Sequence, residues 1–411
     1  MSEHNFYSKL KSIVLTIMIS NKRFTYNGME DMSLMSKWKM PIWFTSFVTL
    51  HAVIGCGSNN PPATSPQDFP AVKAAMEVMG NHYIEGEVSP AEAEDLAKRT
   101  GRLEISGEFT LSSEAAKALA KHQGPLIIGV RKISTNVADE LAKHEGAELS
   151  FPVLRDISDS VAEALSKHQG PLEFNLLRSL SNSAAASFAK HMFPLSLPQI
   201  VGPSDTALES LAKHKGSLKI CLGLREGPLL YSQAKILANH TGNLEIFGFD
   251  SISDDSAKVL AKHKGDLFLP ILREISDEAI DALAKHEGLL KVGFATLVEE
   301  TTTTNLAKHK GNLLLTLPNG LSGNAAKGFK HFKGNLVISS YLELSPQIAK
   351  DLSKHEGKLS LPGVEVLSDE AAEAIAQHKG VVELPSLRYL SETAKDHLNS
   401  NKEIKWAVFP R

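Results

Sequence analysis

A phrase of about 23 residues recurs along most of the chain, and a fixed period of this length constrains the fold more than any other feature. One copy runs from Ile275 to Gly288 and ends in a Lys-His-x-Gly tail. The histidine of this tail recurs at intervals of 22 to 26 residues, as His122, His144, His168, His191, His214, His240, His263, His286, His309, His331, His355 and His378. The period predicts a solenoid whose stacked units bury their apolar faces against each other.

Each unit reads as a short strand, a corner, a short helix and a turn. Residues 149–151 alternate apolar and polar side chains, as a strand with one buried face does. Ser158 then precedes the alanine-rich run 159–168, which is typical of a helix N-cap. Gly170 follows where a left-handed C-terminal cap is expected. About 14 such units predict an α/β repeat solenoid with one continuous parallel sheet.

The spacing Leu149-x-Phe151-x-x-Leu154-x-x-Ile157-Ser158-Asp159 resembles the leucine-rich repeat, and is nearest to its cysteine-containing subtype. Residues 267–277 have the same spacing. Two departures are that leucine replaces the Cys or Asn of the corner and that the Lys-His-x-Gly tail lies outside the general motif. The repeats are also similar to histidine-bearing repeats of planctomycete-like bacteria, which implies a bacterial source and no activity.

Composition excludes several classes of function. The 411 residues carry a formal charge of -3 and 6% aromatic residues, so neither a broad basic field nor base-stacking platforms for nucleic acid are expected. The two cysteines, Cys56 and Cys221, cannot form a disulfide framework and lack zinc-site spacing. With no phosphate-binding loop or nucleophile motif, we predict no cofactor, no metal and no catalysis.

The N-terminal region reads as an export signal. Lys37 and Lys39 precede an apolar run, 41–54, that ends in Gly55-Cys56. This ending resembles the lipobox of bacterial lipoproteins, which implies that Cys56 is acylated and anchors the chain in the cell envelope, facing the periplasm or exterior. A short uncleaved membrane helix is the alternative, although the run is shorter than the ~20 residues that a spanning helix needs.

These features divide the chain into three parts. Residues 1–56 form the signal and lipobox region, in which 1–31 are read as an extension upstream of the true start, because Met32 or Met35 is better placed. Residues 57–68 are a polar, proline-containing flexible linker. Residues 69–411 form the solenoid, with a helix at 72–79 and residues 406–409 expected to cap its two ends.

The twelve histidines are predicted to form a structural ladder. Each ring lies at a helix end, where it can fill the turn and bond a carbonyl that the last turn leaves unpaired. Rings on adjacent coils would lie about 5 Å apart and stay neutral at pH 7, so stability should fall toward pH 5. A linear row offers an ion at most two ligands, which argues against a zinc site.

A partner surface is expected on the variable strand positions, because framework positions are committed to packing. Exposed apolar side chains rimmed by charge gather there, namely Glu245, Phe247, Phe268, Lys291, Leu314 and Val337. The alternatives are that another segment covers them or that the register slips by one residue.

Arginines at another repeat position could form an anion-binding stripe: Arg131, Arg155 and Arg178. Acids often follow such arginines in sequence, as Asp156 follows Arg155, so a self-paired, solvated edge is the alternative.

Segment 192–230 breaks the rhythm, because Met192-Phe193-Pro194 replaces the usual turn and extra residues lie within 222–230. Thr301–Thr304 is expected to weaken another helix start. Cys221 is read as a small semi-buried filler. The resulting prediction is a non-catalytic binding module for a protein or glycan, of open oligomeric state. The alternatives are a structural spacer without a ligand and an enzyme with a site at 192–230.

Overall fold

A computed structural model describes residues 80–223, 227–339 and 344–408. The predicted signal region, Cys56, the linker and the 72–79 helix lie outside the described residues, as does Phe409. Within the described ranges, no helix is both long and apolar enough to cross a membrane.

One 15-stranded sheet runs through the solenoid, and its pairings from β2 to β18 are all parallel. Its strands, in spatial order, are β1 (Asn81–Val88), β2 (Leu103–Leu111), β3 (Leu126–Ile128), β4 (Leu149–Ser150), β5 (Leu172–Glu173), β6 (Leu195–Leu197), β7 (Leu218–Cys221), β9 (Leu244–Phe247), β11 (Leu267–Leu272), β13 (Leu290–Phe294), β14 (Leu313–Thr316), β15 (Leu336–Ser339), β16 (Leu359–Ser360), β17 (Val382–Leu387) and β18 (Ile404–Val408). The predicted α/β solenoid with a continuous parallel sheet is confirmed. A small second sheet, which the sequence reading missed, joins β8 (Pro228–Leu229), β10 (Ser251–Ile252) and β12 (Glu274–Ile275).

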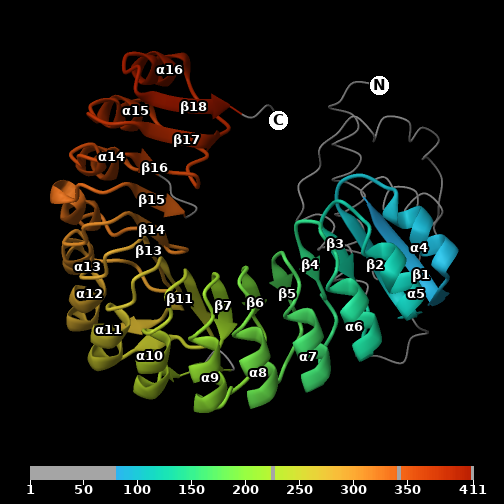
Figure 1. The fold of residues 1–411 in the computed structure, drawn as a ribbon. Coiled ribbons are helices and arrows are strands. Elements are labelled where there is room, and N and C mark those ends of the chain that lie inside the picture. The colour runs from blue at the N-terminus through green and yellow to red at the C-terminus, as the bar shows by residue number, and fades with distance from the viewer. Residues whose placement is uncertain (1–79, 224–226, 340–343, 409–411) are drawn as a thin grey trace, which may run out of the picture. The chain divides into compact units, whose positions relative to one another are not determined.

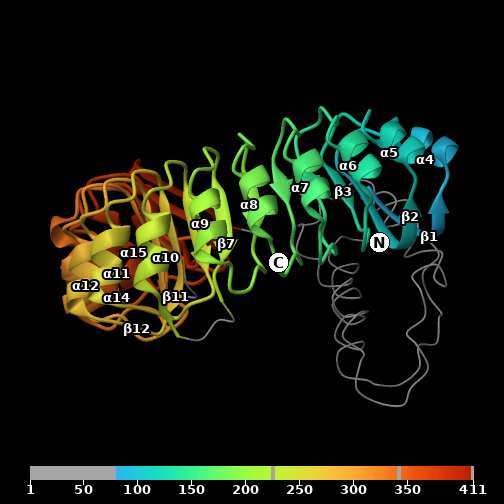
Figure 2. The ribbon, with the colours of Figure 1, turned by 60° about the horizontal axis from the view of Figure 1, so that its bottom comes forward.

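A short helix follows most strands, and the helices lie side by side along the side of the coils opposite the main sheet (Figures 1 and 2). They are α4 (Pro90–Ala97), α5 (Ser113–Leu119), α6 (Thr135–Leu141), α7 (Asp159–Leu165), α8 (Asn182–Phe188), α9 (Asp205–Leu211), α10 (Tyr231–Leu237), α11 (Asp254–Leu260), α12 (Asp277–Leu283), α13 (Glu300–Leu306), the 3-10 helix η3 (Ala325–His331), α14 (Pro346–Leu352), α15 (Asp369–Ala376) and α16 (Glu392–Asn399).

Serine caps hold both the start of a helix and the contact with the coil before it. The Ser276 hydroxyl accepts the N–H of Ala279 at 3.0 Å and donates to the carboxylate of Asp254, which starts the preceding helix. In the same way Ser204 caps α9 and donates to Asn182 at 2.6 Å. The recurrent Ser-Asp step is therefore a contact between coils as well as a cap.

The core is one continuous cluster of buried side chains. The first residue of each strand lies opposite its equivalent in the next strand, as in Leu267↔Leu290 and Leu290↔Leu313. These three leucines are 0% exposed. Since a helix of seven residues is marginal alone, burial between neighbouring coils is what stabilises each unit.

The glycine of each tail is explained by close approach and not by a left-handed cap, which corrects the prediction for Gly170. Gly170 is absent from the glycines with positive φ. A Cβ atom at Gly170 would lie 2.3 Å from the carbonyl oxygen of Ala147 in the preceding coil. One at Gly265 would lie 2.2 Å from that of Gly242. Only a residue without a side chain fits between coils at this spacing.

The threonine run does not spoil its helix. Segment 300–306 forms α13, and Thr303 is 0% exposed, with its hydroxyl donating to the Ala325 carbonyl of the next coil at 2.6 Å. The α-helical rhythm breaks one coil later instead, where a 3-10 helix, η3, replaces the α-helix.

Gly265→Ala should destabilise the solenoid by about 1–3 kcal/mol, because its methyl group would overlap backbone of the preceding coil. Gly323→Ala is the matched control, since a Cβ there meets nothing within 4 Å. Urea unfolding followed by circular dichroism measures both. Equal midpoints for the two variants would contradict the close-approach explanation.

Candidate functional site

Eleven of the twelve predicted ladder histidines are buried in a single row across the coils, each at most 3% exposed. Where neighbouring rings stack, their centroids are 5.7 to 6.3 Å apart and the planes are within 12° of parallel. This spacing follows the strand spacing, slightly widened.

The exception is His331, which is exposed and does not belong to the ladder. Phe332 takes the buried position and stacks on His355 with centroids 5.5 Å apart. The sequence contained the signal for this correction. Ladder histidines stand two residues before the tail glycine, as His286 does before Gly288, and Phe332 stands two before Gly334.

Where a buried imidazole of the ladder has a hydrogen-bond partner, that partner is a carbonyl of the preceding coil rather than of its own helix, as it is for His122, His144, His191, His309, His355 and His378. The Nε2 atom of His355 lies 2.9 Å from the Gly334 oxygen, and Nε2 of His378 lies 2.9 Å from the Gly357 oxygen. The same Gly334 oxygen is the atom that a Cβ at Gly357 would meet at 2.2 Å. In these two coils one glycine carbonyl is thus contacted by both the histidine and the glycine of the next tail, and His122 and Gly124 contact the Gly101 carbonyl in the same way. These contacts fit the spacing of the Lys-His-x-Gly tail.

Burial keeps these rings neutral. Desolvation, the largest cause in each case, lowers the pKa of four histidines to about 4, namely His168, His191, His263 and His355. For His168 and His263 the charge of a neighbouring imidazole lowers the pKa further. Burial also lowers the pKa of His144, His214, His240, His286 and His309. Neutral stacked rings hold neighbouring coils together, and in the part of the chain described no group of three or more His, Cys, Asp or Glu could hold a metal.

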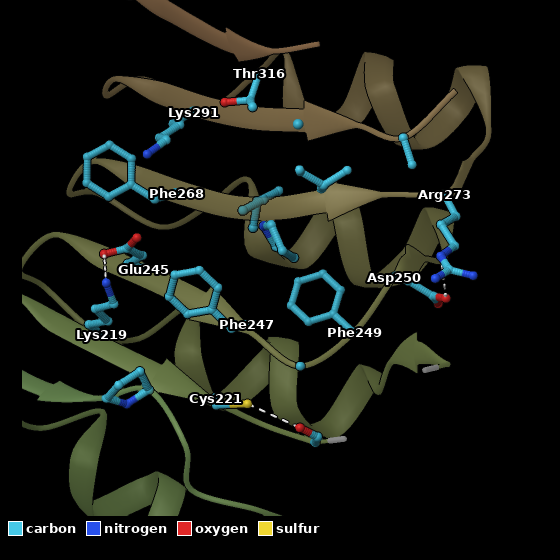
Figure 3. A pocket seen from close by; sticks show the side chains of 18 of the residues that line it. Lys219, Cys221, Glu245, Phe247, Phe249, Asp250, Phe268, Arg273, Lys291 and Thr316 are labelled. Carbon is cyan, nitrogen blue, oxygen red and sulfur yellow. Dashed lines mark hydrogen bonds and ion pairs between the residues drawn. The ribbon is translucent and has the colours of Figure 1, made fainter. Parts of the chain in front are cut away.

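A groove of about 770 Å³ opens on the face of the main sheet, across β7, β9, β11 and β13 (Figure 3). Phe247 and Phe268 are half-buried in it. The Lys219 ammonium lies 5.2 Å from the centre of the Phe247 ring and 3.6 Å from the Glu245 carboxylate. These contacts place aromatic faces and charges next to each other at the surface.

A second ion pair borders the groove on the side away from Lys219 and Glu245 (Figure 3). It joins Arg273 to Asp250 at 3.8 Å. Asp250 also accepts the backbone N–H of Gly227 at 3.1 Å, so it is fixed by the coil before it.

Four of the six predicted surface residues line this groove: Glu245, Phe247, Phe268 and Lys291. The strand register places Leu314 beside Lys291, and Val337 beside Leu314. Both are half-exposed and extend the row on β14 and β15 without lining the groove.

Sequence reasoning missed the other apolar groove residues, chiefly Val201 and Ile271, which are 42% and 44% exposed. The register of β11 against β13 shifts between Phe268 and Ile271, and this bulge brings Ile271 to the surface. Pro270, inside what reads as a strand, was the available signal.

The irregular segment contributes one wall, since Pro198, Val201 and Lys219 line the groove. Cys221 also lies there, but it is 7% exposed and its thiol donates to the Gly223 carbonyl at 3.1 Å. This contact fits the filler role expected for it.

The three arginines of the predicted anion stripe do not behave alike. Arg131 pairs with Glu108, which lies one coil earlier. Arg155 and Arg178 are exposed and make no ion pair with a described acid. Arg388 likewise pairs with an acid of the preceding coil, Glu365, at 3.1 Å. In both pairs the acid lies one coil away and is not the next residue in sequence.

No protein-family model and no curated protein matches the chain. A solved leucine-rich-repeat protein of Leptospira interrogans is similar in structure at 14% identity, with a TM-score of 0.36, over 82% of this chain and 92% of that one. The Toll–Spätzle complex of Drosophila is similar at 8% identity, with a TM-score of 0.37, over 82% of this chain and 62% of that one. The chain has a leucine-rich-repeat-like fold, and its own parallel strands, serine caps and leucine ladder are the features that show it.

The ladder predicts a loss of stability in mild acid. Histidine has a pKa near 6.5 in the unfolded chain and about 4 at His168, His191, His263 and His355 in the folded one. Between these values the unfolded chain binds more protons, so stability is complete above pH 6.5 and falls as the pH drops toward 4. Each of the four should contribute about 2 kcal/mol less at pH 5 than at pH 7.5. Urea midpoints at the two values test this.

His263→Phe is the control, since Phe332 shows that the position accepts a phenyl ring. It should weaken the pH dependence while preserving stability at pH 7.5. A wild-type midpoint that stays flat from pH 7.5 to 5 would contradict the neutral ladder.

Proposed function

We propose that this chain is a non-catalytic module that binds a protein partner through the sheet face of its solenoid. The observation that carries the proposal is the groove around Phe247 and Phe268. Partly exposed aromatic side chains, held in a concave site and bordered by ion pairs, are typical of a binding surface. Neither Phe247 nor Phe268 belongs to the buried core cluster of the solenoid.

The alternative of a spacer without a ligand accounts less well for this face. A spacer needs only soluble side chains at its variable strand positions. Over five consecutive strands those positions hold instead Glu245, Phe268, Lys291, Leu314 and Val337, of which three are apolar.

Binding also accounts for the chemistry of the groove better than catalysis does. The imidazoles that could serve as bases are buried between coils, and Cys221 is engaged with backbone. The acids and bases that line the groove are largely paired with each other, through Lys219–Glu245 and Arg273–Asp250. Paired surface charges of this kind orient a partner.

We further propose that the module is attached to the outside of a membrane through acylated Cys56, so that its partner is a protein of the cell envelope. The support is the Lys37/Lys39 pair, the apolar run 41–54 and the Gly55-Cys56 ending. Several acyl chains on one residue would anchor it stably.

Phe268→Glu should abolish capture of the partner, because it places a charge in the aromatic part of the groove. Full-length wild type and variant are used as baits in envelope extract, and captured proteins are quantified by mass spectrometry. Lys258→Glu is the control, because Lys258 is an exposed residue of α11 outside the groove. This variant should capture the same proteins as wild type does. A protein supports the proposal when it is lost only with Phe268→Glu and its purified form binds wild type at least tenfold more tightly. Identical captures from all three baits would favour the spacer.

Cys56→Ala should release the chain from membranes of a bacterial host that processes lipoproteins. Fractionation, together with incorporation of labelled palmitate, measures the effect. The wild type should be labelled and membrane-bound, and the variant neither. A variant that stays in the membrane fraction would favour the uncleaved helix.

A further inference from the structure

The groove carries one cation without a matching anion. Lys219 and Arg273 each lie within 4.0 Å of a carboxylate, whereas no described acid lies within that distance of Lys291. The Lys291 ammonium instead lies 5.7 Å from the centre of the Phe268 ring. With three cations and two carboxylates, the groove is locally positive on a chain whose formal charge is -3.

Two glycines of the lining mark places where neighbouring coils approach closely. Gly248 has φ +86°, and a Cβ there would lie 2.5 Å from the Gly223 nitrogen. A Cβ at Gly293 would lie 2.7 Å from Cγ1 of Ile271. These glycines line the groove together with the partly exposed apolar side chains of Phe247, Phe268 and Ile271. An apolar group of a partner can therefore enter between these side chains.

The polar lining fits a peptide better than a glycan. The aromatic side chains are phenylalanines, which offer no hydroxyl or N–H group. Gln199 and Thr316 are the uncharged side chains of the lining with a strong hydrogen-bonding group. A sugar presents many hydroxyls that would need such groups, since a buried polar group without a partner is costly.

Strand spacing relates the apolar and the charged parts of the site. Phe247, Phe268 and Lys291 lie on the successive strands β9, β11 and β13. Phe268 is paired with Glu245 and with Lys291, and Phe247 lies two residues further along β9. With neighbouring strands about 4.8 Å apart and a rise of about 3.3 Å per residue, Lys291 lies roughly 8 Å from the midpoint of Phe247 and Phe268 at the level of the backbone, a distance that its long side chain can shorten. Side chains on one face of an extended peptide recur every two residues, at about 6.6–7 Å.

We propose that the groove binds an extended segment of the partner protein that carries an apolar side chain and, two residues away, an acidic one. The apolar side chain packs against Phe247 and Phe268, and the carboxylate pairs with Lys291. This inference rests on the proposed protein-binding function and specifies its partner.

The test uses four pools of synthetic nine-residue peptides with randomised flanks and fixed centres: Leu-x-Glu, Leu-x-Gln, Leu-x-Lys and Ala-x-Glu. Immobilised full-length protein selects from each pool, and mass spectrometry quantifies retention. Wild type should retain Leu-x-Glu at least tenfold more than Leu-x-Lys and more than either remaining pool. Lys291→Glu should reverse the preference between the Glu and Lys pools, and Lys258→Glu should leave it unchanged.

Equal retention of the Glu and Lys pools by wild type, or an unchanged preference in Lys291→Glu, would overturn the inference. So would Phe268-dependent retention of arrayed glycans with no selection among peptides. If the peptides fail while capture of the envelope partner still depends on Phe268, the binding function stands and only the assigned partner chemistry is wrong.

Discussion

Neighbouring coils approach each other so closely at the turn after most helices that a glycine is needed there. A Cβ atom at Gly242, Gly265 or Gly357 would lie 2.2 Å from a glycine carbonyl of the preceding coil. This approach brings the leucines of successive strands into register and lets several serine caps reach the residue that starts the preceding helix, as Ser276 reaches Asp254. A unit of this size has no core of its own, so the distance between coils sets the stability of the solenoid.

The histidine row is a consequence of the same approach. The carbonyl oxygen of a tail glycine faces the next coil, where a histidine ring nitrogen can lie against it. The Nε2 atom of His378, for example, contacts the oxygen of Gly357 in the preceding coil. Both ring nitrogens of His168, His214, His240, His263 and His286 lack a hydrogen-bond partner in the described structure, so these rings contribute mainly by stacking and filling space. This explains why Phe332 can take the buried position of a histidine and stack on His355.

Much of this architecture could be predicted from the sequence, because the repeat tests each assignment many times. Ser158 predicted a helix start, and its hydroxyl accepts the N–H of Val161 at the start of α7. The prediction failed where one sequence pattern has two physical explanations. Gly170 was compatible with a left-handed cap or with close approach, and only the neighbouring coil decides between them. Of the groove, the strand-face residues were found, but Ile271 was not, since a bulge changes which side chains share a face.

The groove lies where the chain departs from its own repeat. A bulge at Pro270, an irregular wall at Pro198 and Val201, and a left-handed Gly248 all occur within a few coils of each other. A departure from an otherwise consistent repeat makes packing less regular and brings no stability. Such departures are therefore expected where a function requires them. In the proposed function, stability and binding are carried by different residues of the same coils, so the proposed partner surface can change while the glycine, histidine and serine contacts stay fixed.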